Sequence, residues 1–390
     1  MVMVIITQLF TKKVSRIYFE SQLNTLKQYK TFRHLNNVEY VSKKHITINA
    51  KTYINFTSND YLGLAQLPIN INQLNDYLSY YGINYASSRL VSGNSQLYQN
   101  IERLFCSHYP FEDALITNSG YDANLAIFNI FKDQGVIVFS DARNHASIID
   151  GIKLSGLSKR IYPHLDYNAL DQQLSLHPTT TKLIVTDSIF STHGTMADLQ
   201  QIITLKKRHP NTYIVVDHAH GLGLNLYDTL EGIDILTASL SKALGTQGGI
   251  ILCSNTVKQL LVNLARPLIY SSALPIFNLY QIERNLHYLC AQSYRATKLV
   301  HLSQYFNRLA KDKMNTQNCH TLSPIKYIEF DSYKDAETIY EQLLTEGILV
   351  SYFRYPTVDI PMLRISLSYF HNEDDIKLLL QLCHNLTKGD

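Results

Sequence analysis

The sequence contains no tryptophan and few cysteines. The lack of tryptophan, beside 27 tyrosines, is a compositional bias that points to no chemistry. The cysteines are an odd number, lie far apart and form no Cys-x-x-Cys pair, which argues against a disulfide framework and a structural zinc site and suits a reducing cytoplasm. They are Cys106, Cys253, Cys290, Cys319 and Cys383. We therefore expect a cytoplasmic protein without a metal centre.

The sequence also lacks a large excess of charge of one sign, and it has no long apolar runs. Charged residues make up 17% of the chain, and 35 Lys and Arg against 32 Asp and Glu give a net charge of +3, which offers no basic surface for nucleic acid. No stretch approaches the roughly 18 apolar residues of a membrane-spanning helix. The apolar N-terminal run MVMVIITQLF has no basic segment before it and no cleavage pattern, so we interpret it as mature protein. We expect a soluble protein with no nucleic-acid or membrane partner.

Apolar residues make up 45% of the 390 residues, and this length is typical of about two to three domains. Between about residues 115 and 253, short apolar runs alternate with helical patterns, as is typical of a parallel sheet with crossover helices. The predicted strands are 114–117, 136–140, 183–187, 213–217, 234–239 and 249–253. Each run is apolar throughout, so we expect helices on both faces of the sheet.

The pattern changes after about residue 279. A long helical region to about residue 310 is followed by a polar loop containing Asn315 and Asn318, and then by short mixed elements that include a helix at 334–346 and a closing helix from Asn372. We divide the chain into an N-terminal helical and hairpin extension (1–50), a large α/β domain (51–280) and a smaller C-terminal α+β domain (281–390).

Polar side chains follow several predicted strands, at the edge where ligands bind in parallel sheets. Lys242 lies between small residues in a glycine-rich turn, and a partly buried lysine offers a neutral amine for a Schiff base. Asp217 ends a strand, where it could cap a helix or pair with a protonated pyridine nitrogen. His220 could bond a ring hydroxyl and His145 could stack on the ring. Each residue alone fits a structural role, but the four together favour a site for pyridoxal 5′-phosphate (PLP).

The same edge offers a site for a phosphate. Ser119, Gly120 and Tyr121 lie where a predicted strand turns into a helix, whose free amides and dipole favour an anion. Gly120 allows close approach of the backbone, and Ser239 can add a hydroxyl.

Five ordered motifs carry a resemblance to a known family. They are 56–64 (FTSNDYLGL), 87–94 (SSRLVSGN), 119–121 (SGY), 217–221 (DHAHG) and 239–242 (SLSK). In order and spacing they resemble the α-oxoamine synthases, over about residues 50 to 370. The resemblance implies a PLP-dependent transferase of fold type I, aspartate-aminotransferase-like, with a mostly parallel sheet in the large domain. Residues 266–275 (RPLIYSSALP) most resemble the 8-amino-7-oxononanoate synthases of biotin biosynthesis.

The resemblance assigns roles to the candidate site residues. Lys242 matches the Schiff-base lysine, Asp217 the partner of the pyridine nitrogen, His220 the partner of the ring hydroxyl and His145 the stacking histidine. Further cofactor contacts are implied for Ser119, Gly120, Tyr121, Ser191 and Ser239.

The resemblance also implies a homodimer with the site at the subunit interface, in which Ser271 and Ser272 reach the phosphate of the neighbouring copy. Arg364 matches the arginine that binds the amino acid's carboxylate, and Asn59 assists it. Arg33 would meet the far carboxylate of the acyl substrate.

The implied reaction is a decarboxylative condensation of L-alanine with pimeloyl-CoA, or with pimeloyl-acyl carrier protein, to 8-amino-7-oxononanoate. Glycine C-acetyltransferase, 5-aminolevulinate synthase, a long-chain autoinducer synthase and an aminotransferase remain alternatives. A non-catalytic partner subunit is a further one, although such subunits lack the lysine. His193, where the family usually has an acid, and Tyr85, in a stretch poor in glycine, leave the acyl specificity open.

Overall fold

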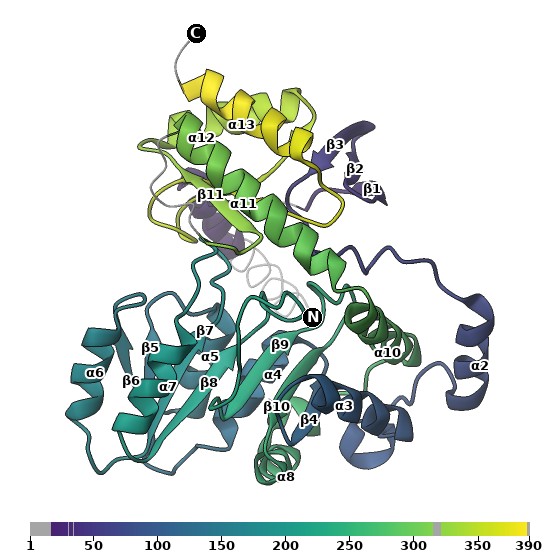
Figure 1. Cartoon of the computed structure of the whole chain (residues 1–390), viewed down its shortest axis with the longest axis vertical. Coiled ribbons are helices and arrows are strands. Elements are labelled where there is room, and N and C mark those ends of the chain that lie inside the picture. The colour runs from purple at the N-terminus through teal and green to yellow at the C-terminus, as the bar shows by residue number, and fades with distance from the viewer. Residues whose placement is uncertain (1–16, 30, 34, 315–320, 388–390) are drawn as a thin grey trace, which may run out of the picture.

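The computed structural model describes residues 17–29, 31–33, 35–314 and 321–387. The N-terminal apolar run and the predicted loop at Asn315 and Asn318 lie outside these ranges. Figure 1 shows a large sheet with helices on both sides and, next to it, a smaller part that contains two further sheets. Within the described residues, no helix is long and apolar enough to cross a membrane.

The large sheet has seven strands. In spatial order they are β4 (Asp113–Thr117), β10 (Gly249–Cys253), β9 (Ile235–Ser239), β8 (Thr212–Asp217), β7 (Lys182–Asp187), β5 (Ile137–Asp141) and β6 (Ser158–Tyr162). All six predicted strands are present, within one residue at each end.

Two features of this sheet differ from the prediction. β10 runs antiparallel to both neighbours, because the short turn after β9 leaves no room for a crossover helix. The edge strand β6 was not predicted, since four of its five residues are exposed and it lacks an apolar run. The sheet is therefore mostly parallel.

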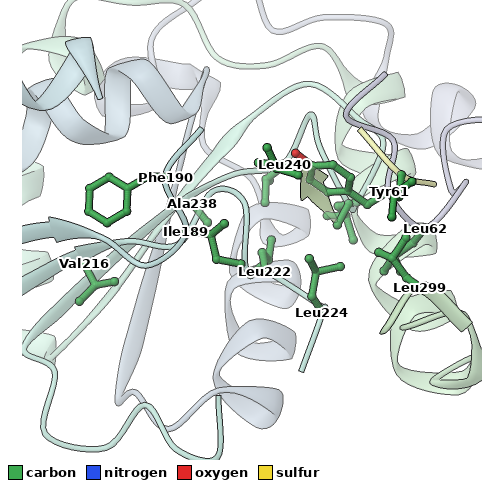
Figure 2. Close-up of a cluster of buried hydrophobic side chains, with 14 of the residues drawn as sticks. Tyr61, Leu62, Ile189, Phe190, Val216, Leu222, Leu224, Ala238, Leu240 and Leu299 are labelled. Atoms are coloured by element: carbon green, nitrogen blue, oxygen red, sulfur yellow. The ribbon is translucent and has the colours of Figure 1, made fainter. Parts of the chain in front are cut away.

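Helices cover both faces of the sheet, as expected. Val215 of β8 packs into one apolar cluster, while its neighbours Ile214 and Val216 point into the other. On the Val215 face lie α4 (Gly120–Asn129), α5 (Ala146–Ser155), α8 (Asn255–Leu264) and α9 (Arg266–Ile269). On the other lie α3 (Gln96–His108), α6 (Tyr167–Ser175), α7 (Leu199–Arg208) and α10 (Ile276–Ala291). Figure 2 shows part of this second cluster.

The smaller part combines the two ends of the chain. A helix at 17–28 precedes β1 (Val38–Ser42), β2 (His45–Ile48) and β3 (Lys51–Asn55), and β3 pairs in parallel with β12 (Ile348–Leu349). A second sheet has the order β11 (Ile325–Glu329), β14 (Met362–Ser366) and β13 (Ser351–Phe353). Three helices accompany them, α11 (Tyr294–Met314), α12 (Tyr333–Thr345) and α13 (Glu373–Thr387).

Two further elements are the helix α2 (Ile71–Tyr81) and the π-helix η1 (Arg89–Gly93). The predicted hairpin extension and the helices at 334–346 and from Asn372 correspond to β1–β2, α12 and α13. The division of the chain at residues 50 and 280 remains a prediction.

Candidate active site

A cavity of about 950 Å³ lies at the carboxyl edge of the large sheet, where segments 351–360 and β14 form its opposite wall. Loops that follow β5, β7, β8 and β9 supply one side of its lining. Six predicted site residues line it: Asn59, His145, Ser191, His220, Lys242 and Arg364. The structure thus brings together residues that are up to about 300 positions apart in the sequence.

Lys242 lies in the loop between β9 and β10. The loop is closed by backbone hydrogen bonds, among them Gly245 N–H to Lys242 O at 2.9 Å, and Gly245 has a φ of +67°. Burial lowers the pKa of the Lys242 amine, with a smaller contribution from Arg364, and the carboxyls of Asp217 and Asp187 oppose the shift. The amine is therefore shifted toward its neutral, nucleophilic form.

Asp217 is a buried carboxylate with defined donors. Its Oδ2 accepts from Asn124 Nδ2 at 2.6 Å, and its Oδ1 accepts from the Ala219 amide at 2.9 Å. Asn124 is fixed in turn by Thr237, whose Oγ1 donates to Asn124 Oδ1 at 2.7 Å. These contacts hold the carboxylate in one orientation and stabilise its charge.

His145 belongs to the same hydrogen-bond network. Ser147 Oγ lies 2.8 Å from Asn124 Nδ2, from which it accepts, and 2.7 Å from His145 Nδ1. Burial lowers the pKa of His145, Lys242 acts in the same direction and Asp217 opposes it. A largely neutral ring that accepts from Ser147 at Nδ1 is thus fixed at the cavity wall.

Arg364 is buried on β14, and its guanidinium has three acceptors. Nε donates to Ser191 O at 2.6 Å, one terminal nitrogen to Ser366 Oγ at 2.7 Å and the other to Asn59 Oδ1 at 3.2 Å. A planar, fixed guanidinium is suited to a carboxylate.

The predicted phosphate site is a close contact between two turns. A Cβ on Gly120 would lie 2.7 Å from Ser239 Cβ, so only glycine fits there. Ser119 caps α4 by accepting from the Asp122 amide, and Ser239 Oγ lies 2.8 Å from Ser241 Oγ. Tyr121 is exposed, and its hydroxyl bonds Asp150.

Eight predicted residues do not line the main cavity: Asp217 and the predicted phosphate-site residues Ser119, Gly120, Tyr121 and Ser239, which are described above, and Arg33, Ser271 and Ser272. Arg33 donates to Thr357 Oγ1 at 3.1 Å and lines a separate cavity with Tyr355 and Pro356. Ser271 and Ser272 do not line the main cavity, but the Ser272 carbonyl accepts from the Asn118 side chain at 2.8 Å, next to the predicted phosphate site. The described residues contain no cluster of metal-ligating side chains.

Sequence reasoning missed several polar residues of the site. They are Tyr61, Asn124, Ser147, Asp187 and Thr237. Asp187 pairs in register with Asp217, and its Oδ1 has no hydrogen-bond partner among the described residues. Burial raises the pKa of Asp187 well above its usual range, with Asp217 acting in the same direction. The sequence signal that could have identified Asp187 as a site residue is its position at the end of a predicted strand.

Comparisons with known proteins give one family. The model for aminotransferase class I and II matches residues 51–381. A putative 8-amino-7-oxononanoate synthase from Thermodesulfovibrio yellowstonii is 32% identical over 371 residues, covering 93% of this chain and 95% of that protein. An 8-amino-7-oxononanoate synthase from Saccharophagus degradans is 35% identical over 342 residues, covering 85% and 86%.

Solved structures share the fold. The 8-amino-7-oxononanoate synthase from Francisella tularensis matches with a TM-score of 0.75 and 28% identity, covering 86% of this chain and 98% of that chain. A serine palmitoyltransferase from S. paucimobilis matches with a TM-score of 0.86 and 22% identity, covering 95% and 96%. The chain therefore belongs to the aminotransferase class I and II family of fold type I and, within it, to the 8-amino-7-oxononanoate synthases of the α-oxoamine synthase family.

Proposed function

We propose that this chain is a PLP-dependent acyltransferase that condenses L-alanine with a pimeloyl thioester, on CoA or on acyl carrier protein, and releases carbon dioxide and the free thiol. The product is 8-amino-7-oxononanoate, an intermediate of biotin biosynthesis. The observation that carries the proposal is one cavity lined by Lys242, His220 and Arg364, in a chain related to such synthases over most of its length.

PLP fits the residues that are present. Gly120 and Ser239 approach so closely that no side chain fits between them, which suits a backbone cradle for a phosphate. Lys242 would bond the cofactor, Asp217 would hold a proton at the ring nitrogen and His145 would cover the ring. When bound, PLP supplies an electron-withdrawing ring that stabilises negative charge on the carbon beside the amino group.

The chain's own residues would bind the amino acid and move its proton. Arg364 would orient the substrate carboxylate, since its guanidinium is already fixed by Ser191 and Ser366. Lys242 Nζ would accept the α-proton as general base, because burial favours the neutral amine. Asp217, fixed by Asn124, would keep the ring nitrogen protonated throughout.

We extend the proposal to a homodimer in which Ser271 and Ser272 complete the neighbouring copy's phosphate site. Exposed apolar side chains around this segment support an interface, namely Leu90, Val91 and Tyr270. Sedimentation analysis of the purified chain tests it, and a monomer would contradict it. A cytoplasmic location remains a prediction.

Thiol release from PLP-loaded protein tests the function. Alanine, glycine and serine are crossed with pimeloyl-, succinyl-, acetyl- and long-chain acyl-CoA, and release is expected only with alanine and pimeloyl-CoA. Lys242→Ala should abolish both release and the absorption band of the lysine-bound cofactor. Lys206→Ala is the control, because Lys206 pairs with Asp234 away from the cavity. Release with another pair would assign a different α-oxoamine synthase activity.

A further inference from the structure

One buried hydroxyl lies between the two halves of the site. Tyr61 is fully buried, and its ring packs among leucines in the cluster that Figure 2 shows. Its oxygen lies 2.7 Å from His220 Nδ1 and 3.2 Å from Asn59 Oδ1. Tyr61 therefore contacts both the predicted partner of the cofactor's hydroxyl and the asparagine that bonds Arg364.

The hydroxyl carries one proton and has two possible acceptors. Burial raises the pKa of Tyr61 to about 12, so the hydroxyl is protonated near neutral pH and can donate. Asn59 Oδ1 already accepts from Arg364, and the contact with His220 is the shorter one. Both observations favour donation from Tyr61 to Nδ1 of His220.

This donation defines the tautomer of His220. Burial lowers the pKa of His220 well below its usual range, and the nearby groups Lys242, Arg364 and His145 act in the same direction, so the ring is neutral. A neutral imidazole has one N–H, and a ring that accepts at Nδ1 carries its proton on Nε2. No described residue bonds Nε2, and His220 lines the cavity.

We propose that Tyr61 is a positioning residue that holds His220 as an Nε2–H donor toward the ring oxygen of the bound cofactor. The proposal rests on the proposed PLP site and extends it. A hydrogen-bond donor at that oxygen stabilises the oxygen's negative charge. The stabilisation is largest when the neighbouring lysine-bound nitrogen has lost its proton, because no positive charge then remains beside the oxygen. Tyr61 thereby lowers the pH at which that nitrogen deprotonates.

The absorption spectrum of the lysine-bound cofactor, recorded across pH, tests this effect. Tyr61→Phe removes only the hydroxyl and should raise the midpoint pH of the spectral change by about one unit, the amount expected when the His220 hydrogen bond to the negatively charged ring oxygen is lost. Tyr167→Phe is the matched control, since its hydroxyl accepts from the Asp198 amide at 2.7 Å and lies outside the cavity. An unchanged midpoint in Tyr61→Phe, or an equal shift in the control, overturns the proposal.

A second variant tests whether Tyr61 acts through His220. In His220→Gln the side-chain amide places its own N–H near the position of Nε2 and does not depend on Tyr61. Adding Tyr61→Phe to His220→Gln should therefore give no further shift. A full additional shift would mean that Tyr61 acts by another route, and the proposal fails.

The tautomer can also be measured without cofactor. Long-range ¹H–¹⁵N NMR spectra of the histidine-labelled wild-type chain distinguish a proton on Nε2 from one on Nδ1, and the His220 signals are identified by their loss in His220→Gln. A proton on Nε2 supports the proposal, and one on Nδ1 overturns it. If the wild-type protein forms no lysine-bound band, the proposed function fails, while this measurement still decides the role of Tyr61.

Discussion

Replacing Asn124 with alanine should impair both stability and cofactor binding. The side chain is 2% exposed and donates to the Asp217 carboxylate and to Ser147, while it accepts from Thr237. A hydrogen bond to a charged group contributes about 1.5–3 kcal/mol and a neutral one about 1 kcal/mol, so we expect a loss of about 3 to 5 kcal/mol in the free energy of unfolding. Because Asp217 also loses its alignment, the affinity for PLP should fall at least about tenfold.

Urea unfolding and PLP titration of the cofactor-free protein measure the two effects of Asn124→Ala. Asn307→Ala is the matched control, since Asn307 accepts from Lys326 at 2.7 Å and donates to Thr321 O at 2.9 Å, and none of these three residues lines the cavity. It should lose stability and keep its PLP affinity. The reasoning is refuted if Asn124→Ala binds PLP as the wild type does, or if the control loses affinity equally.

Two further predictions concern substrate binding and acid stability. Arg364→Lys should raise the KM for alanine at least about tenfold and leave the affinity for PLP within about twofold of the wild type, because lysine cannot replace three fixed hydrogen bonds. Steady-state kinetics and PLP titration measure the two effects. Weaker binding of both alanine and PLP would contradict the prediction. Burial lowers the pKa of His218 to about 4, so the ring stays neutral when folded but takes up a proton when unfolded. Stability should therefore fall as the pH drops from about 6.5 to 4, by roughly 3 kcal/mol more in the wild type than in His218→Gln. Urea unfolding across this pH range measures the free energy of unfolding of both proteins, and an equal loss of stability in the wild type and in His218→Gln would contradict the prediction.

The strands and the main site residues could be predicted because two signals are local. A strand buried on both faces is a continuous apolar run, and in a parallel sheet the residues after such runs meet at one edge. Lys242, Asp217, His145 and His220 were assigned to the site in this way. The exposed edge strand β6 has no such run, and strand direction depends on the length of the connection rather than on composition, so β6 and the antiparallel β10 were not predicted.

The supporting residues could not be predicted because their signals are not local. Asn124 sits inside a largely apolar helix, where asparagine is only mildly unfavourable, and its partners Asp217 and Thr237 come from strands about 100 residues later. Tyr61 is one aromatic residue among many in a sequence with 27 tyrosines. Only the packing of α4 and of the segment around Tyr61 against the sheet shows that Asn124 and Tyr61 each form a hydrogen bond with a site residue.

The walls of the site come from two different parts of the chain. In the proposed function one wall would serve the cofactor and the other would select the substrate. Gly120 and Asn124 lie one turn apart on α4, so the helix whose N-terminus suits a phosphate also positions Asp217 and, through Ser147, His145.

The opposite wall comes from segment 351–360 and β14, and Phe353, Val358 and Ile360 give it an apolar lining that suits a methylene chain. Burial lowers the pKa of His193, on the cavity wall, to about 4, so this position is uncharged near neutral pH. In the proposed function, changes in these wall residues would alter the choice of acyl group without disturbing α4 or the large sheet.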